Sequence, residues 1–441
     1  MNRAAQSSIQ SEVADLHANW AHHRWLRAGN RYERNCLKRI KTDAGPNRKV
    51  RHQHLREYIA ASSVLHAIDG WSFLGRALDA HLRGDLDSSR HLGYYAELRA
   101  AMALLAAEGI GVFGNIHVIV NSRRRCECIR ASTTHEFVWD ALQHWSTTSA
   151  ASDLLFRIVE PGGIPLADWL NRFSAGASLR FVLAERWLLK WGLDLSRFAE
   201  DRDARNLSSY RPTAFAIPRA LSVKETLKFA REFWMLYEPS ESVRFGMLDR
   251  HLLRHALDLA FNSAHAAGRT RKQAKRMFQQ QVASMLHGLS PEGLNDEQWR
   301  RFLAYDDSEH TPLLLAEAAG TAGRDDPNHP RQVLARAFLL LRIATGACHA
   351  LLQSLPGTVR EHLRFWWSGL GEDHGLWNAG DEPDRFVDLW ADIREACGDL
   401  DAWEQSVPSG SVTYKSVWCE KPSAAAVLGS CERIGLWGIG I

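Results

Sequence analysis

The chain has 441 residues, a hydrophobic content of 45% and a formal net charge of +3. This length predicts two or three domains with a sizeable core, and the small net charge argues against a protein coated uniformly with basic side chains. Arginine supplies 44 of the 54 basic residues. Arginine suits bidentate contact with phosphate or carboxylate, although a GC-rich bacterial genome would give the same bias.

The cysteines and the apolar segments bear on location. Seven cysteines are scattered without any C-x-x-C pair, a pattern typical of reduced thiols in a cytosol. The N-terminus has no apolar signal core, and the most apolar segment, 335–352, contains two arginines and a histidine, so it is a poor membrane span. We therefore expect a soluble, cytoplasmic protein that does not bind a membrane.

The segment 87–111 has the features of a complete helix with two packing faces. Asp87, Ser88 or Ser89 can cap the first amides, and Gly109 can take the left-handed turn that ends the helix. Small residues recur at three- and four-residue spacing along one side, and they are Gly93, Ala96, Ala100, Ala103 and Ala107. We expect the preceding helix, 57–82 with a break at 69–71, to pack antiparallel against this seam.

A change of pattern follows this central helix. Strand-forming residues flank a polar turn, which predicts one small β-hairpin near residues 116–130 that presents Arg123, Arg124 and Arg125. Thr133 and Glu136 then have the spacing of a capping box at the start of another helix.

The rest of the chain predicts helices separated by loops rich in Gly and Pro. The expected helices are 165–173, 178–192, 196–208, 224–236 and 243–267, followed by a Trp-rich helical region up to Pro408 and an irregular or weakly β tail. The predicted fold is therefore mostly α, in multi-helix domains with one small hairpin. We expect an N-terminal helical module with the hairpin at 1–150, a helical middle region at 151–290 and the Trp-rich helical region at 291–441.

Residues 22–57 form a basic cluster with eleven Arg or Lys against three acids. Aromatic residues are interleaved with the cations, among them Trp25, Tyr32 and Tyr58. Cations with aromatics between them suit a phosphate backbone and unstacked bases. A solvated pair of amphipathic helices has the same pattern, so both interpretations stay open.

Several signatures of catalysis are absent from the sequence, namely GxxxxGK[ST], GxGxxG after a strand, GxSxG and HExxH. His251, His255 and Asp258 share one face of a predicted helix, but Leu252 stands where a metalloprotease needs its general-base Glu. We therefore expect neither a metal site nor a cofactor.

One short motif lies where the helix 196–208 gives way to a turn. Arg205 and Asn206, followed by Tyr210, resemble the R-N-x-x-x-H signature of the HEPN superfamily, helical nucleotide-binding and ribonuclease domains common in prokaryotic toxin and antiviral systems. In that family's metal-independent ribonucleases, an Arg and a His paired across a dimer cleft hold the scissile phosphate and move protons. A phenol is a poor base near neutral pH, so the resemblance implies RNA binding without cleavage, or cleavage with a borrowed group.

An Arg followed five residues later by a His occurs four times, about twice as often as chance predicts for 44 Arg and 20 His. Arg250 and His255 fit best, because a polar residue follows the Arg inside a predicted helix. Residues five apart on a regular helix point about 140° apart, so this pair needs a local break or a dimer partner to converge. Arg130 and His135 flank a helix N-terminus, where an anion can bind.

A second resemblance covers residues 88–145. A helix with Tyr-Tyr and small residues, a short strand with His117 and an Arg-rich turn follow one another in an order that is similar to the YaaC-like proteins of bacteria. This resemblance implies a bacterial context and no mechanism.

These features predict a HEPN-like RNA-binding protein of a bacterial antiviral or toxin system. If the protein is catalytic, we expect it to be a metal-independent ribonuclease effector. The candidate catalytic residues are Arg250, His255, Arg205 and Tyr210. The candidate nucleic-acid contacts are Asn206, Arg211, Arg123, Arg124 and Arg125. The expected partners are RNA and a second copy or a multi-protein complex. The alternative is a non-enzymatic helical adaptor or sensor subunit of such a complex.

Overall fold

The computed structural model describes residues 4–45, 49–173, 182–210, 222–264, 270–306, 311–323, 329–408 and 412–440. In these ranges the chain forms twenty α-helices, two short 3-10 helices and three strands. The α-helices are α1 (Gln6–Trp20), α2 (Cys36–Asp43), α3 (His52–Leu82), α4 (Leu86–Ala107), α5 (Thr134–Ser146), α6 (Ser149–Ile158), α7 (Leu166–Arg172), α8 (Ala184–Lys190), α9 (Arg197–Tyr210), α10 (Val223–Met235), α11 (Gly246–Ala264), α12 (Arg271–Leu286), α13 (Asp296–Leu303), α14 (Leu313–Ala318), α15 (Pro330–Leu352), α16 (Val359–Asp373), α17 (Trp390–Ser406), α18 (Tyr414–Glu420), α19 (Pro422–Leu428) and α20 (Glu432–Gly440). The strands are β1 (Ile110–Phe113), β2 (Ile116–Val120) and β3 (Cys126–Arg130), and the 3-10 helices are η1 (Pro161–Gly163) and η4 (Phe386–Leu389).

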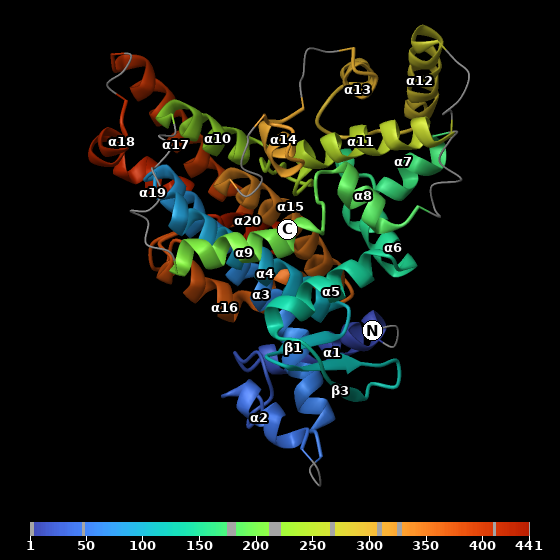
Figure 1. Ribbon diagram of the computed structural model, residues 1–441, viewed down its shortest axis with the longest axis vertical. Coiled ribbons are helices and arrows are strands. Elements are labelled where there is room, and N and C mark those ends of the chain that lie inside the picture. The colour runs from blue at the N-terminus through green and yellow to red at the C-terminus, as the bar shows by residue number, and fades with distance from the viewer. Residues whose placement is uncertain are drawn as a thin grey trace.

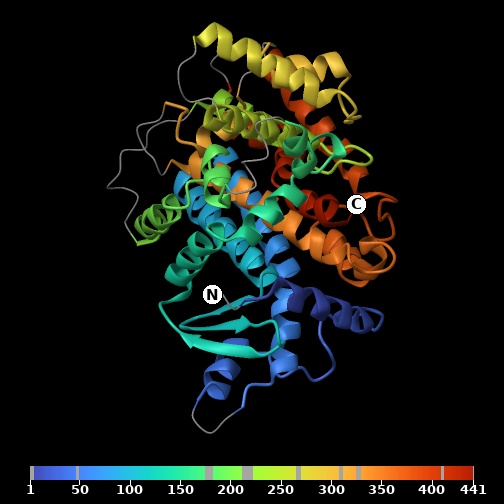
Figure 2. The same cartoon turned by 90° about the vertical axis from the view of Figure 1, so that its right-hand side faces the viewer.

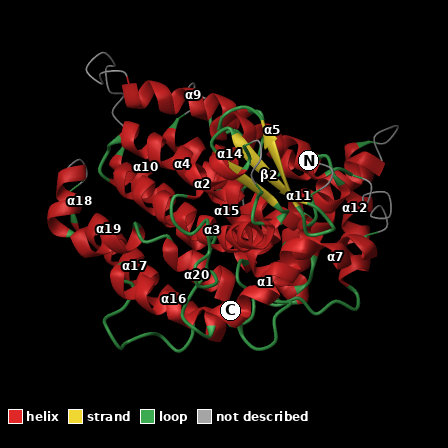
Figure 3. Ribbon diagram, turned by 90° about the horizontal axis from the view of Figure 1, so that it is seen from below, coloured by secondary structure: helices red, strands yellow, loops and turns green. Residues whose placement is uncertain are grey.

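The molecule has a small lower part and a larger helical body (Figures 1 and 2). The lower part contains the sheet, α1, α2 and the beginning of α3, and α3 runs from there up into the body. Figure 3 shows the three strands as one small group next to α5, with helices around it. The predicted mostly α fold with a small β element is confirmed.

The helices α3, α4 and α15 pack together at the centre. The small-residue seam of α4 takes α15 as well as α3, since a Cβ at Gly93 would lie 3.2 Å from Cγ1 of Val333. The predicted break at 69–71 is wrong, because α3 continues through it. Gly70 is needed there for close packing, since a Cβ would lie 2.5 Å from Cδ2 of Leu341 on α15. The cap of α4 also differs from the expected residues, because the Asp85 carboxylate accepts from the Ser88 amide.

Helix α15 is buried almost throughout, and its three arginines join it to three other helices. Arg331 Nε donates to His81 Nε2 on α3 at 3.1 Å. Arg336 makes two hydrogen bonds of 2.8 and 2.6 Å to Asp201 on α9. Arg342 makes two of 3.0 and 2.6 Å to Asp249 on α11. Burying a charge is tolerated when it is paired and hydrogen-bonded, so these contacts fix the neighbouring helices around α15.

By length and composition, α15 is the one helix in the described ranges that could cross a membrane, yet 94% of its most apolar window is buried inside the protein. Core helices of soluble proteins meet the same criterion. The finding therefore does not identify a membrane span.

The sheet has the antiparallel order β1-β2-β3. Strands β2 and β3 form the predicted hairpin, with Val118 opposite Cys128. Strand β1 is an addition to the predicted hairpin, because its residues fall at the end of the predicted helix 87–111 and in the loop after it. It pairs with β2 so that Ile110 lies opposite Ile119. Gly109, at φ +87°, makes the turn between α4 and β1.

The expectation of an irregular or weakly β tail is wrong, because the tail contains α18, α19 and α20. Helix α20 packs against α3 and α15. A Cβ at Gly435 would lie 2.5 Å from Cδ1 of Ile68, so this close approach depends on glycine. The buried apolar side chains form one core, whose members range from Ile9 near the N-terminus to Ile439 near the C-terminus. All three expected regions, 1–150, 151–290 and 291–441, contribute residues to this core.

Candidate nucleic-acid interface and catalytic residues

The lower part of the molecule carries a large excess of positive charge. Residues 22–57 and 110–133 together contain fifteen Arg or Lys and four Asp or Glu, in a chain whose total is +3. Ten of these cations are exposed and have no ion-pair partner in the described ranges; they are Arg24, Arg34, Lys38, Arg39, Lys41, Lys49, Arg51, Arg123, Arg125 and Arg130. We call this surface the basic lobe.

Two of the four acids of the basic lobe form ion pairs inside it. Glu57 is buried and pairs with Arg27. Asp43 is also buried and accepts two hydrogen bonds of 2.6 Å from Arg31. The first pair holds the segment before α2 against α3, and the second holds it against the end of α2. Neither carboxylate pairs with an outer cation in the described ranges.

Two of the aromatic residues interleaved with these cations, Trp25 and Tyr32, pack against the interior of the protein. Tyr32 is fully buried, and its hydroxyl donates to Asp43 at 3.0 Å. Trp25 packs on α16, with ring centroids 5.8 Å from Phe365 and 5.0 Å from Trp366. Of the two interpretations left open for this cluster, these positions do not favour base stacking on Trp25 and Tyr32. What remains is a surface suited to phosphate contacts.

The hairpin presents two of its three expected arginines to solvent. Arg123 and Arg125 are exposed, while their backbone amides donate to Oδ1 of Asn121 and fix the turn. Arg124 takes a positive φ of 57° and turns back to pair with Glu12 at 2.7 Å and with Asp15. These hydrogen bonds raise the pKa of Arg124. This arginine therefore anchors α1 and is not a free cation.

The residues of the R-N motif do not converge. Arg205 is only 8% exposed, and its guanidinium carbon lies 5.1 and 5.4 Å from the ring centroids of Tyr94 and Tyr95. Tyr210, at the end of the same helix, is 81% exposed. Asn206 is half-buried, and Arg211 lies outside the described residues. Arg205 thus packs α9 onto α4, while Tyr210 extends into solvent.

Two histidines that the motif did not include lie near Arg205. His135, at the start of α5, has Nδ1 2.9 Å from the Tyr94 hydroxyl. His91 on α4 has Nδ1 2.7 Å from Oγ of Ser209. Burial, followed by the charge of Arg205, lowers the pKa of both rings. The spacing of Arg130 and His135 drew attention to His135, but no sequence signal placed either histidine beside α9.

The second expected pair, Arg250 and His255, also stays apart. Both lie on α11, which is helical from Gly246 to Ala264, so five residues separate the side chains by about 140°. Burial, with lesser contributions from Lys190 and His251, lowers the pKa of His255 to about 4. This ring is therefore neutral near pH 7.

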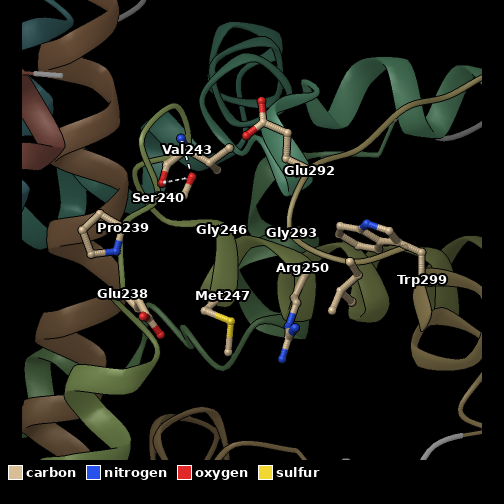
Figure 4. A pocket seen from close by; sticks show the side chains of 12 residues that line it. Glu238, Pro239, Ser240, Val243, Gly246, Met247, Arg250, Glu292, Gly293 and Trp299 are labelled. Atoms are coloured by element: carbon tan, nitrogen blue, oxygen red, sulfur yellow. Dashed lines mark hydrogen bonds between the residues drawn. The ribbon is translucent and has the colours of Figure 1, made fainter. Parts of the chain in front are cut away.

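Arg250 lines a pocket of about 200 Å³ between α11 and the loops around Pro239 and Gly293. Figure 4 shows Met247 and Arg250 projecting from α11 on the same side. The walls are mainly apolar, and the Arg250 guanidinium lies 4.9 Å from the Phe302 ring. This volume is below the usual range for small-molecule sites, and His255 is not among its lining residues.

No family model matches the chain, and neither the curated proteins nor the solved structures contain a significant match. In the described part of the chain, no group of three His, Cys, Asp or Glu side chains could hold a metal ion.

Proposed function

We propose that this protein binds RNA through backbone phosphates on the basic lobe, and that it does so as a non-catalytic subunit. The observation that carries the proposal is the set of ten exposed cations without carboxylate partners in the described ranges. Phosphate contacts supply sequence-independent affinity and release counterions from the nucleic acid. The separation of Arg205 from Tyr210, and of Arg250 from His255, favours binding without cleavage.

The experiment is a titration of fluorescent single-stranded RNA at several salt concentrations. Replacing Arg51, Arg123 and Arg125 by Gln together should reduce the slope of log affinity against log salt by about 2, since each phosphate on a single strand contributes about 0.7. Affinity should fall at every salt concentration tested. The fold should be unchanged because all three side chains are exposed.

A matched control removes three exposed arginines from the helical body, Arg186, Arg276 and Arg394. The net charge changes by the same amount, so an equal loss of RNA affinity in the control would show that overall charge, and not the basic lobe, determines binding.

Metal-independent RNA cleavage is the second candidate function, and the observation that favours it is the position of His91 and His135 beside Arg205. A neutral histidine can accept a proton from a ribose 2′-hydroxyl while an arginine holds the phosphate. The test is an RNA cleavage assay in the presence of a chelator. Activity that is lost in His135→Ala, with RNA affinity retained, would support cleavage. If the unmodified protein leaves the RNA intact, the cleavage hypothesis is contradicted and the non-catalytic proposal stands.

A further inference from the structure

A larger cavity, of about 970 Å³, lies in the basic lobe between α2 and the surfaces of α3, α4 and β1. This volume is near the upper end of the range for small-molecule sites. Three cations, Lys38, Lys41 and Arg99, line the cavity, and no Asp or Glu is found among its described lining residues. The cavity therefore has a positive wall that attracts an anion.

Arg99 and His66 lie side by side in the wall of the cavity and can both donate hydrogen bonds to a ligand. Nη1 of Arg99 lies 2.8 Å from Nδ1 of His66 and 3.6 Å from Oδ2 of Asp69. Burial, followed by the charge of Arg99, lowers the pKa of His66 to about 3, so the ring is neutral near pH 7. Arginine can only donate, so Nδ1 accepts and the ring proton lies on Nε2. That N–H has no partner in the described ranges and can donate to a ligand.

Helix α2 begins at the wall of the same cavity, which Asn35, Cys36, Leu37 and Lys38 all line. Asn35 precedes the helix with φ 57°, and its side chain does not cap the first amides. Free amides at a helix start favour an anion. They supplement the three cations and His66.

The remaining wall of the cavity is apolar. Met102, Val112 and Phe113 form it together with Leu37, whose side chain is 41% exposed although it is large and hydrophobic. The Tyr58 and Phe113 rings lie with their centroids 5.8 Å apart at this side. A planar group placed here would cover Leu37 and contact aromatic rings.

We propose that this cavity binds a small phosphate ester of mononucleotide size, with the phosphate toward the cations and the planar group against the apolar wall. The cavity shares Lys38 and Lys41 with the ten exposed cations of the basic lobe, whereas Arg99 and His66 belong to the cavity alone. Variants of Arg51, Arg123 and Arg125, which do not line the cavity, therefore separate nucleotide binding from RNA binding.

Isothermal titration with three probes tests the two-part character of the site. Adenosine 5′-monophosphate should bind at least tenfold more tightly than adenosine, which lacks the phosphate, and than inorganic phosphate, which lacks the planar group. Equal binding of either fragment, or no binding of the nucleotide, would overturn the proposal. A 5′-phosphorylated RNA that displaces the nucleotide would also overturn it, by assigning the cavity to an RNA end, whereas a lack of displacement supports a small ligand.

Variants then locate the binding. Arg99→Gln and Lys41→Gln should each weaken nucleotide binding about tenfold, and Lys41 is exposed, so its replacement leaves folding intact. Lys272→Gln, an exposed lysine on α12, should have no effect. The triple variant of Arg51, Arg123 and Arg125 should retain nucleotide binding even though it loses RNA affinity. If it loses nucleotide binding too, the nucleotide is held by the general charge of the basic lobe and the cavity proposal fails.

Discussion

Helix α15 and the basic lobe use arginine in opposite ways. Arg336 and Arg342 are buried, and each makes a two-pronged contact with one aspartate. Arg123 and Arg125 are exposed, and their side chains have no carboxylate partner in the described ranges. An arginine with a buried partner contributes to folding specificity, whereas one without a partner keeps its charge for an external anion. Composition alone cannot separate these roles, so the 44 arginines of the chain are not evidence of function until each is located.

The largest expected effect comes from breaking an interior pair. Arg342→Met leaves Asp249 buried without its partner, which should lower the free energy of unfolding by about 3–5 kcal/mol. Urea unfolding followed by circular dichroism measures this loss. Adding Asp249→Leu removes the uncompensated charge and should recover much of the stability. If the double variant is no more stable than the single one, pairing is not what keeps this arginine in the core.

Within the described ranges, Glu108 is a buried carboxyl group without an arginine ion pair, in contrast to Asp249. Glu108 is 7% exposed, and burial raises its pKa to about 7. Because this pKa is about 4.5 in the unfolded state and about 7 in the folded state, the free energy of unfolding is highest below about pH 4.5. It then decreases as the pH rises to about 7, since the unfolded state loses the proton first. This shift corresponds to about 3 kcal/mol. Glu108→Gln should remove the decline, so the variant should gain stability relative to the unmodified protein as the pH rises.

Urea midpoints measured between pH 4.5 and 8 check the Glu108 prediction. Glu185→Gln, at an exposed position on α8, is the matched control and should leave the pH profile unchanged. A constant difference between Glu108→Gln and the unmodified protein at all pH values would contradict the assignment.

Arg205 falls between the two classes, because it is buried against aromatic rings and not against an aspartate. Arg205→Ala should lower the free energy of unfolding by about 1 kcal/mol through lost cation–π contact with Tyr94 and Tyr95. RNA affinity should not change if the basic lobe is the binding surface. A loss of RNA affinity in a folded variant would instead support a HEPN-like role for this residue.

The smallest effect on stability is expected at the hairpin. Arg125→Met should change the free energy of unfolding by no more than about 0.5 kcal/mol, because the side chain is exposed. The same variant should reduce the salt dependence of RNA binding by about 0.7 of a unit in slope. A large loss of stability would show that Arg125, like Arg124, is part of the scaffold.

Features with a local cause could be predicted from the sequence. The capping box of Thr133 and Glu136 is present as expected, because its contacts span only four residues. Gly109 takes its positive φ next to the end of α4, where its position already indicated a turn. The exposure of Arg123 and Arg125 follows from the polar turn that carries them.

Features decided by distant contacts could not be predicted. Gly70 reads as a helix break until Leu341 is known to pack on it. The pairing of Arg124 with Glu12 joins residues 112 positions apart. His135 is brought near Arg205 by the packing of α5 on α9, which no spacing in either segment encodes. The R-N motif does not include His91 and His135 for the same reason, since these histidines lie on helices other than the one that carries Arg205.

The packing of α15 between earlier and later helices has a consequence during synthesis on the ribosome. Helix α3 ends at Leu82 and α4 at Ala107, and their central partner α15 begins at Pro330. At typical translation rates of about 5–20 residues per second, the apolar surface that they share with α15 waits roughly 10–45 seconds for it. Helix α15 then waits in turn for α20, which covers another part of it. The nascent chain therefore has an extended period in which a holdase chaperone can bind, and slowing translation should increase its aggregation more than that of a protein with local contacts.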